Sequence, residues 1–117
     1  MARITMQGKG NSREIVQYLR DEMLKTGMSV ELLERFERTF HGVTVYTLVF
    51  EKYFMRSSNR ASLTAVLMDQ EGEILVDIIG SAGGQGVFFK MSWGAEEDFI
   101  YSLESILETL GFSRIEQ

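Results

Sequence analysis

The stretch that decides the fold is residues 43–55, Val-Thr-Val-Tyr-Thr-Leu-Val-Phe-Glu-Lys-Tyr-Phe-Met. It is dense in β-branched and aromatic residues, which favour the pleated, half-buried surface of a β-strand. His41-Gly42 comes directly before it and predicts a tight turn. Residues 28–40 fit both a helical face and an alternating strand, and we favour the strand because the turn then completes a hairpin.

The strand pattern continues on both sides of this hairpin. The predicted strands are residues 2–7, 28–40, 43–55, 61–68, 73–79 and 87–91. Two other segments have the apolar spacing of amphipathic helices. The first begins at the N-cap Asn11 and stops before Gly27, and the second spans about residues 94–110 and stops at Gly111.

These elements predict an α+β fold of order β-α-β-β-β-β-β-α. Successive hairpins make the sheet antiparallel, with five to six strands, and the two helices pack on one of its faces in a two-layer sandwich. The 117 residues fit one domain, 1–117.

Composition excludes several classes of site and partner. The chain has no cysteine and a single histidine, His41, so we expect no disulfide, no metal site and no cofactor. A net charge of −5 argues against binding to nucleic acid or to an anionic membrane. The N-terminus lacks the apolar core of a signal peptide and no apolar run is long enough to span a bilayer, which predicts a cytoplasmic protein.

Both faces of the predicted sheet are apolar. On the strand at 43–55, Val43, Val45 and Val49 point one way, and Tyr46, Leu48 and Phe50 point the other. Two helices cover one face, so the second face requires a curved sheet around a cavity, a long loop or a second protomer. Our leading hypothesis is a non-enzymatic binding or assembly module that forms a homodimer through this second face.

Two loops supply candidate ligand-binding residues. The candidates are Arg56, Ser58, Asn59, Arg60, Gly83, Gly84, Gln85 and Trp93. Two guanidinium groups in the 56–60 turn could clasp a carboxylate or phosphate, although a solvated turn with its arginines paired to Glu51 or Glu71 explains the same residues. The glycine-rich 80–86 segment is either a flexible turn or a loose anion site.

The second hypothesis is therefore a binder of a small anionic or lipid-like ligand. Its pocket would lie between the sheet and the helices, gated by the 56–60 turn and the 80–86 loop. An enzyme ranks third, because the sequence offers no catalytic residue in a nucleophile–base pair. Carboxylates and Tyr46, Tyr53 or Tyr101 remain the groups that could act in a cavity.

Two resemblances to known families bear on these hypotheses. Ser81-Ala82-Gly83-Gly84-Gln85 resembles the Gly-Gly-Gln loop of peptide release factors, but the chain departs from that family after Gln85 and lacks its basic tail. The run from Phe50 to Thr64, together with Gly83–Gly86 and Ser92–Glu97, resembles a family of small uncharacterised bacterial proteins. That second resemblance implies a bacterial origin and carries no activity.

Overall fold

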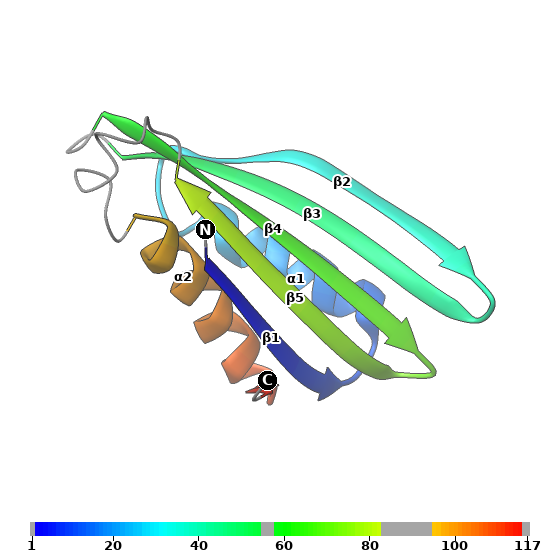
Figure 1. The fold of residues 1–117 in the computed structure, drawn as a ribbon. Helices are drawn as coiled ribbons and strands as arrows, with labels where there is room; N and C mark the ends of the chain where they lie inside the picture. The colour runs from blue at the N-terminus through cyan, green and yellow to red at the C-terminus, as the bar shows by residue number, and fades with distance from the viewer. Residues whose placement is uncertain (1, 55–57, 83–94, 116–117) are drawn as a thin grey trace.

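The computed structural model describes residues 2–54, 58–82 and 95–115 (Figure 1). Its elements are β1 (Ala2–Lys9), α1 (Ser12–Leu24), β2 (Val30–Phe40), β3 (Val43–Phe54), β4 (Asn59–Gln70), β5 (Glu73–Ala82), α2 (Ala95–Thr109) and β6 (Ser113–Arg114). The predicted α+β class is confirmed. The ambiguous segment at 28–40 is a strand, as the turn after it indicated.

The six strands form one antiparallel sheet of order β2-β3-β4-β5-β1-β6. Both helices lie on the same side of it, which confirms the predicted two-layer arrangement (Figure 1). The sixth strand differs from the prediction: β6 follows α2 and is only two residues long, too short to give a periodic signal. The strand predicted at 87–91 lies outside the described residues.

The β2–β3 and β4–β5 hairpins are closed by turns of the same kind. His41 and Gly42 have φ values of 51° and 80°, and Glu71 and Gly72 have φ values of 53° and 86°. Positive φ at both central residues marks the two-residue turns whose twist matches that of paired strands. Each turn ends in glycine, which adopts this conformation without a steric penalty.

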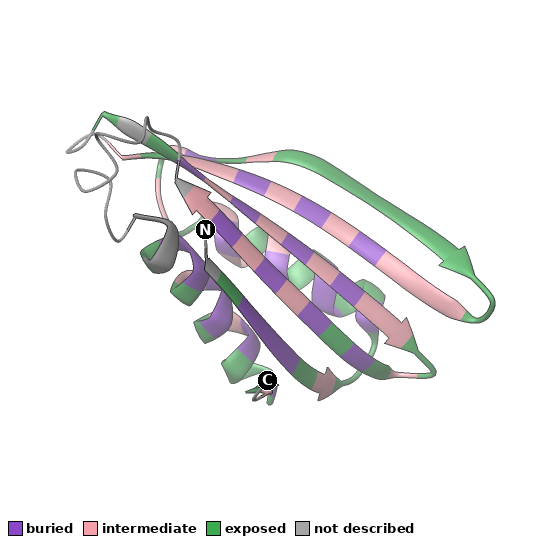
Figure 2. Cartoon of the chain, in the orientation of Figure 1, coloured by how far each residue is buried: buried purple, intermediate pink, exposed green. Residues whose placement is uncertain are grey.

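The core lies between the sheet and the helices. Along β3, β4 and β5, buried side chains alternate with half-buried ones, as the banding in Figure 2 shows. Tyr46, Leu48 and Phe50, which the sequence placed on the face opposite the valines, are buried, and Ile15, Leu19 and Met23 of α1 belong to the same buried cluster. The second helix adds its own buried stripe, Phe99, Ile100, Leu103 and Leu107. The period-two and period-3.6 patterns therefore meet in one apolar layer.

The helix ends follow local chemistry. The Asn11 side chain accepts a hydrogen bond from the Glu14 N–H at 3.1 Å, which confirms the predicted N-cap. The first helix ends at Leu24, before Gly27, because the Thr26 hydroxyl bonds the Met23 carbonyl at 2.7 Å and the chain turns there. At the end of α2, Gly111 has a φ of 91° and stops the helix as predicted.

The turn after α2 leads the chain back to β1. Phe112 is buried, and its ring lies directly over Gly8: a Cβ at Gly8 would lie 2.6 Å from ring carbons of Phe112. Arg114 then donates two hydrogen bonds to the buried Glu104, Nε to Oε2 at 2.8 Å and Nη2 to Oε1 at 2.9 Å. This bonding raises the pKa of Arg114 above its ordinary value. A packed ring and a bidentate ion pair thus hold β6 on the sheet.

Gly8→Ala tests the close approach of Phe112. We expect it to lower the free energy of unfolding by about 1–3 kcal/mol, because the ring cannot withdraw without opening the core. Chemical denaturation measures the change. In a Phe112→Ala background the same substitution should cost much less, since the clashing ring is gone. An equal cost in both backgrounds would contradict this account.

Candidate functional site

The structure describes only part of the predicted ligand-binding set. Arg56, Gly83, Gly84, Gln85 and Trp93 lie outside the described residues. Asn59 is the first residue of β4, and Ser58, directly before it, is exposed with a φ of 51°. Arg60 follows on β4 and is the one member of the set whose side-chain contacts the structure defines.

Arg60 lies in a local ion pair on the sheet. Its Nη1 donates to Oε1 of Glu51 at 2.7 Å, and its guanidinium carbon lies 5.6 Å from the ring centroid of Tyr53. Glu51 was one of the two partners that the sequence suggested for an arginine of this turn. The Glu51 carboxylate neutralises part of the charge of Arg60, so this contact lowers the affinity that the arginine offers to an anion.

The two predicted loops begin at the same end of the sheet. Ala61 of β4 is paired with Ala82 of β5, and the hydroxyls of Ser62 and Ser81 lie 2.9 Å apart. The described ends of the 56–60 turn and of the 80–86 loop are therefore neighbours, although some twenty residues separate them in the chain. The hypothesis of a ligand pocket gated by both loops requires the two loops to begin close together.

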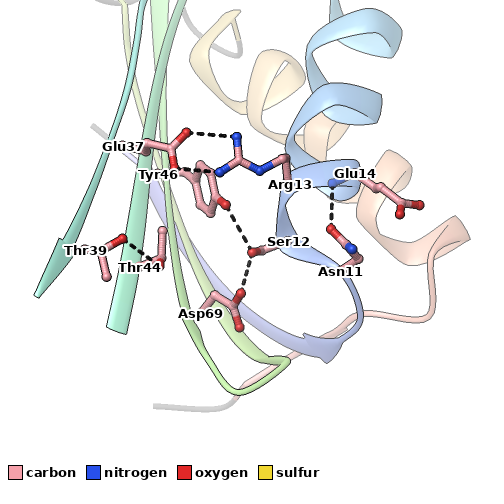
Figure 3. A network of polar contacts seen from close by, with 9 residues as sticks. All are labelled: Asn11, Ser12, Arg13, Glu14, Glu37, Thr39, Thr44, Tyr46 and Asp69. Atoms are coloured by element: carbon pink, nitrogen blue, oxygen red, sulfur yellow. Dashed lines mark hydrogen bonds and ion pairs between the residues drawn. The ribbon is translucent and has the colours of Figure 1, made fainter. Parts of the chain in front are cut away.

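A polar cluster fastens α1 to the opposite end of the sheet (Figure 3). The Ser12 hydroxyl donates to Oδ2 of Asp69. The Tyr46 hydroxyl lies 3.4 Å from the Ser12 hydroxyl. The other Asp69 oxygen accepts the N–H of Gly72 at 2.9 Å. Ser12 and Tyr46 are 5% and 4% exposed, whereas Asp69 is half-buried. We assign the cluster to holding the helix on the β4–β5 hairpin.

No sequence motif announced this cluster, because its members come from three distant segments. Ser12 and Asp69 are separated by 57 residues, and Ser12 and Tyr46 by 34. The available local signal was the N-cap beside it: a helix that begins at residue 12 places its first side chain against the sheet. Only the tertiary fold determines which groups meet it there.

The sheet face turned away from the helices is the largest unassigned surface in the described structure. We call it the outer face. Its apolar members on the three central hairpin strands are Val43, Val45, Val49, Val66, Met68, Leu75 and Ile79. Leu75 is exposed and the others are half-buried. Because neither helix lies over this face, the two-sided apolarity predicted from the sequence is present in the fold (Figure 1).

A hollow of about 850 Å³ lies at one end of the outer face. Val43, Met68 and Leu75 contribute apolar lining, and Leu110 with the turn after α2 forms a wall. Gln7, Lys9, Gln70 and Glu73 line it with polar groups. This is the hairpin end of the sheet, remote from the 56–60 turn. Its position therefore differs from the pocket expected between the sheet and the helices.

A further residue singled out in the sequence, His41, contacts its neighbour in the chain. His41 occupies its predicted turn, with its ring 4.1 Å from that of Phe40.

Within residues 2–54, 58–82 and 95–115, no three His, Asp or Glu side chains are arranged to hold a metal ion. None of the helices in these ranges is long and apolar enough to cross a membrane.

Comparison with known proteins gives one result. Residues 1–111 match the model of a family of unknown function, DUF6054. The chain belongs to this family. The match spans nearly the whole chain, and the resemblance to an uncharacterised family noted in the sequence is thereby confirmed. A search of curated proteins found no match.

Ser12→Ala tests the role of the polar cluster. We expect a loss of about 1–3 kcal/mol in the free energy of unfolding, because the substitution leaves the half-buried Asp69 carboxylate and the buried Tyr46 hydroxyl with fewer partners. Thr39→Ala is the matched control: it removes the exposed 3.0 Å contact between the Thr39 and Thr44 hydroxyls and should change stability by under about 0.5 kcal/mol. Equal losses in urea denaturation would show that the burial of Ser12 contributes nothing.

Proposed function

We propose that this protein is a non-enzymatic binding and assembly module that forms a homodimer through the outer face of its sheet. The supporting observation is that the outer face carries apolar side chains on all three of β3, β4 and β5, with Thr47, Thr64 and Asp77 among them, and that neither helix lies over it. Antiparallel sheets with one solvated face normally place polar residues on it. Contiguous exposed apolar surface with a polar rim is typical of protein interaction sites.

The charges around this face suit a second copy of the same chain. Two copies that each carry −5 repel one another at long range. On the outer face, however, cations stand beside anions: Lys9 is paired with Glu73 across the strands, and Arg60 bonds Glu51. The charges of the rim are therefore partly balanced, and the Asp77 carboxylate beside Val66 accepts a hydrogen bond from the Thr5 hydroxyl at 2.7 Å.

Val66→Glu tests the outer-face dimer. Val66 lies at the centre of the face, between Thr47 and Asp77 on the neighbouring strands, so a carboxylate there should be strongly unfavourable in an interface. We expect the wild type to sediment with at least twice the 13.4 kDa chain mass and the variant to shift to a smaller species. The measurement is sedimentation velocity over a micromolar concentration series.

Tyr18→Glu is the matched control for this experiment. Tyr18 is an exposed residue of α1, on the helical layer and away from the outer face. The same charge introduced there should leave the mass of the wild-type species unchanged. A wild type that remains monomeric throughout the series, or an equal shift in both variants, would refute the outer-face dimer.

Binding of a small ligand in the hollow is the second candidate function. Its volume of about 850 Å³ is within the usual range for ligand pockets. Lys9 and Glu73 oppose each other at its polar edge, so their charges offset, while Met68, Leu75 and Leu110 supply apolar contact. This lining favours a lipid-like ligand over a strongly anionic one.

Native mass spectrometry of gently purified protein tests this candidate. If the hollow retains a ligand, the wild type carries an additional mass, and Leu110→Glu should lose it because a charge then projects from the apolar wall. Leu110 follows α2 and is not one of the outer-face residues of β3–β5, so self-association should be unchanged in this variant. Additional mass that persists in Leu110→Glu would place the ligand elsewhere, and a wild type without additional mass would count against retention.

A further inference from the structure

Strand β2 forms one edge of the sheet. Along its 11 residues only Val30 is buried, and Figure 2 shows most of the strand as exposed. Its exposed large apolar side chains are Leu33, Phe36 and Phe40, which are 50%, 42% and 75% exposed. A long edge strand with exposed apolar side chains is a template for pairing with another strand.

The turn at residues 41 and 42 determines which backbone groups of β2 face outward. In a two-residue hairpin the residues that flank the turn form a hydrogen-bonded pair, and hydrogen-bonded and non-bonded pairs then alternate along the ladder. Phe40 flanks the turn opposite Val43, so Phe36 directs its N–H and C=O groups toward β3. The backbone N–H and C=O groups of Arg35 and Glu37 therefore point to the free edge of the sheet.

The side chains at this edge are self-complementary in an antiparallel pair. In Glu34-Arg35-Phe36-Glu37-Arg38, positions equidistant from Phe36 carry opposite charges. If Phe36 of one copy lies opposite Phe36 of another, Glu34 faces Arg38 and Arg35 faces Glu37, twice each by symmetry. Opposite charges directly across two strands are stabilising, whereas like charges are destabilising.

The neighbouring registers lack this complementarity. The outward-facing backbone groups require odd residues to pair with odd residues, so the alternatives shift the two-fold axis by one residue. One of them places Arg35 opposite itself, and the other places Glu37 opposite itself. A uniformly charged edge would oppose every pairing. The charges on this edge disfavour the two adjacent registers and favour the one centred on Phe36.

We propose that β2 pairs with β2 of a second copy, antiparallel about a two-fold axis at Phe36, and joins two six-stranded sheets edge to edge. Arg35 and Glu37 form hydrogen-bonded pairs on both sides of the axis, and the two Phe36 rings meet in the closer, non-hydrogen-bonded position. The bulge between Leu32 and Glu34 limits the regular pairing to the residues that follow it.

This interface is independent of the outer-face dimer. It uses the backbone of β2 and the side chains beside it, whereas the proposed outer-face contact uses β3, β4 and β5. A two-fold axis perpendicular to the sheet leaves both outer faces on the same side. On the inner side, Glu37 bonds Arg13 at 3.2 Å and Arg35 bonds Gln17 at 2.9 Å, both on α1 (Figure 3 shows the first). We therefore base the test on Glu34 and Arg38, which lie on the outer side.

The first experiment mixes two charge-reversal variants, Glu34→Arg and Arg38→Glu, both in the Val66→Glu background to remove outer-face association. Alone, each variant places like charges opposite each other twice, and we expect its dimerisation constant to weaken about tenfold or more relative to Val66→Glu alone. Mixed, the two chains restore both attractive pairs. Native mass spectrometry should then show the heterodimer above either homodimer.

The second experiment uses the absence of cysteine from the chain. Phe36→Cys places a thiol on the two-fold axis, where Cα atoms of a non-hydrogen-bonded pair lie about 4.5 Å apart, within the range that a disulfide spans. We expect a cross-linked dimer on mild oxidation. Phe40→Cys is the matched control, because two such sites lie about 27 Å apart in this register and should remain unlinked.

The outcomes separate the two interfaces. If neither charge reversal weakens association and Phe36→Cys cross-links no better than Phe40→Cys, the edge pairing is wrong, whatever Val66→Glu does. If Val66→Glu leaves the wild-type mass unchanged while the mixed variants form a heterodimer, the edge pairing stands and the outer-face dimer is refuted.

Discussion

Successive side chains of a β-strand point to opposite faces of the sheet, and the rest of this structure depends on that constraint. Along β3, Tyr46, Leu48 and Phe50 are buried against the helices, while Val43, Val45 and Val49 remain half-buried on the other side. A shift of one residue in the pairing would exchange these two sets. The register of the hairpins therefore determines both the core and the outer face.

The order of the strands adds the second constraint. Because β1 lies between β5 and β6, the N-terminal strand pairs with strands far along the chain, and the chain after α2 must return to the far side of β1. Phe112 on Gly8 and the bonds from Arg114 to Glu104 hold that return in place. The opposite edge, β2, has no comparable attachment beyond β3 and α1 in the described residues. The two edges of the sheet are thus built for different purposes.

The proposed function uses surfaces of the fold and not an internal site. In the polar cluster, Ser12 and Tyr46 are buried and Asp69 is half-buried, and the contacts of all three are accounted for by the attachment of α1. The outer face, the hollow at its hairpin end and the edge of β2 are the surfaces that packing within the chain leaves available. Binding and assembly are processes that such surfaces support directly, without a cofactor or a nucleophile.

Local patterns in the sequence determined the elements of this protein. The density of β-branched residues at 43–55, the turn residues at His41-Gly42 and the cap at Asn11 were each sufficient to predict a strand, a hairpin and a helix start, because each acts over a few residues. The alternation along the strands also predicted that both faces of the sheet are apolar. These predictions hold in the structure because antiparallel hairpins join neighbours in sequence.

The tertiary structure decided what local patterns cannot encode. The pairing of β1 with β5 and β6 and the meeting of Ser12 with Asp69 depend on how distant segments are packed. The ligand pocket was expected between the sheet and the helices, yet the hollow lies on the outer face, since its wall comes from the turn after α2. The charge pattern of β2 was legible in the sequence, but only the sheet order showed that this strand is an edge.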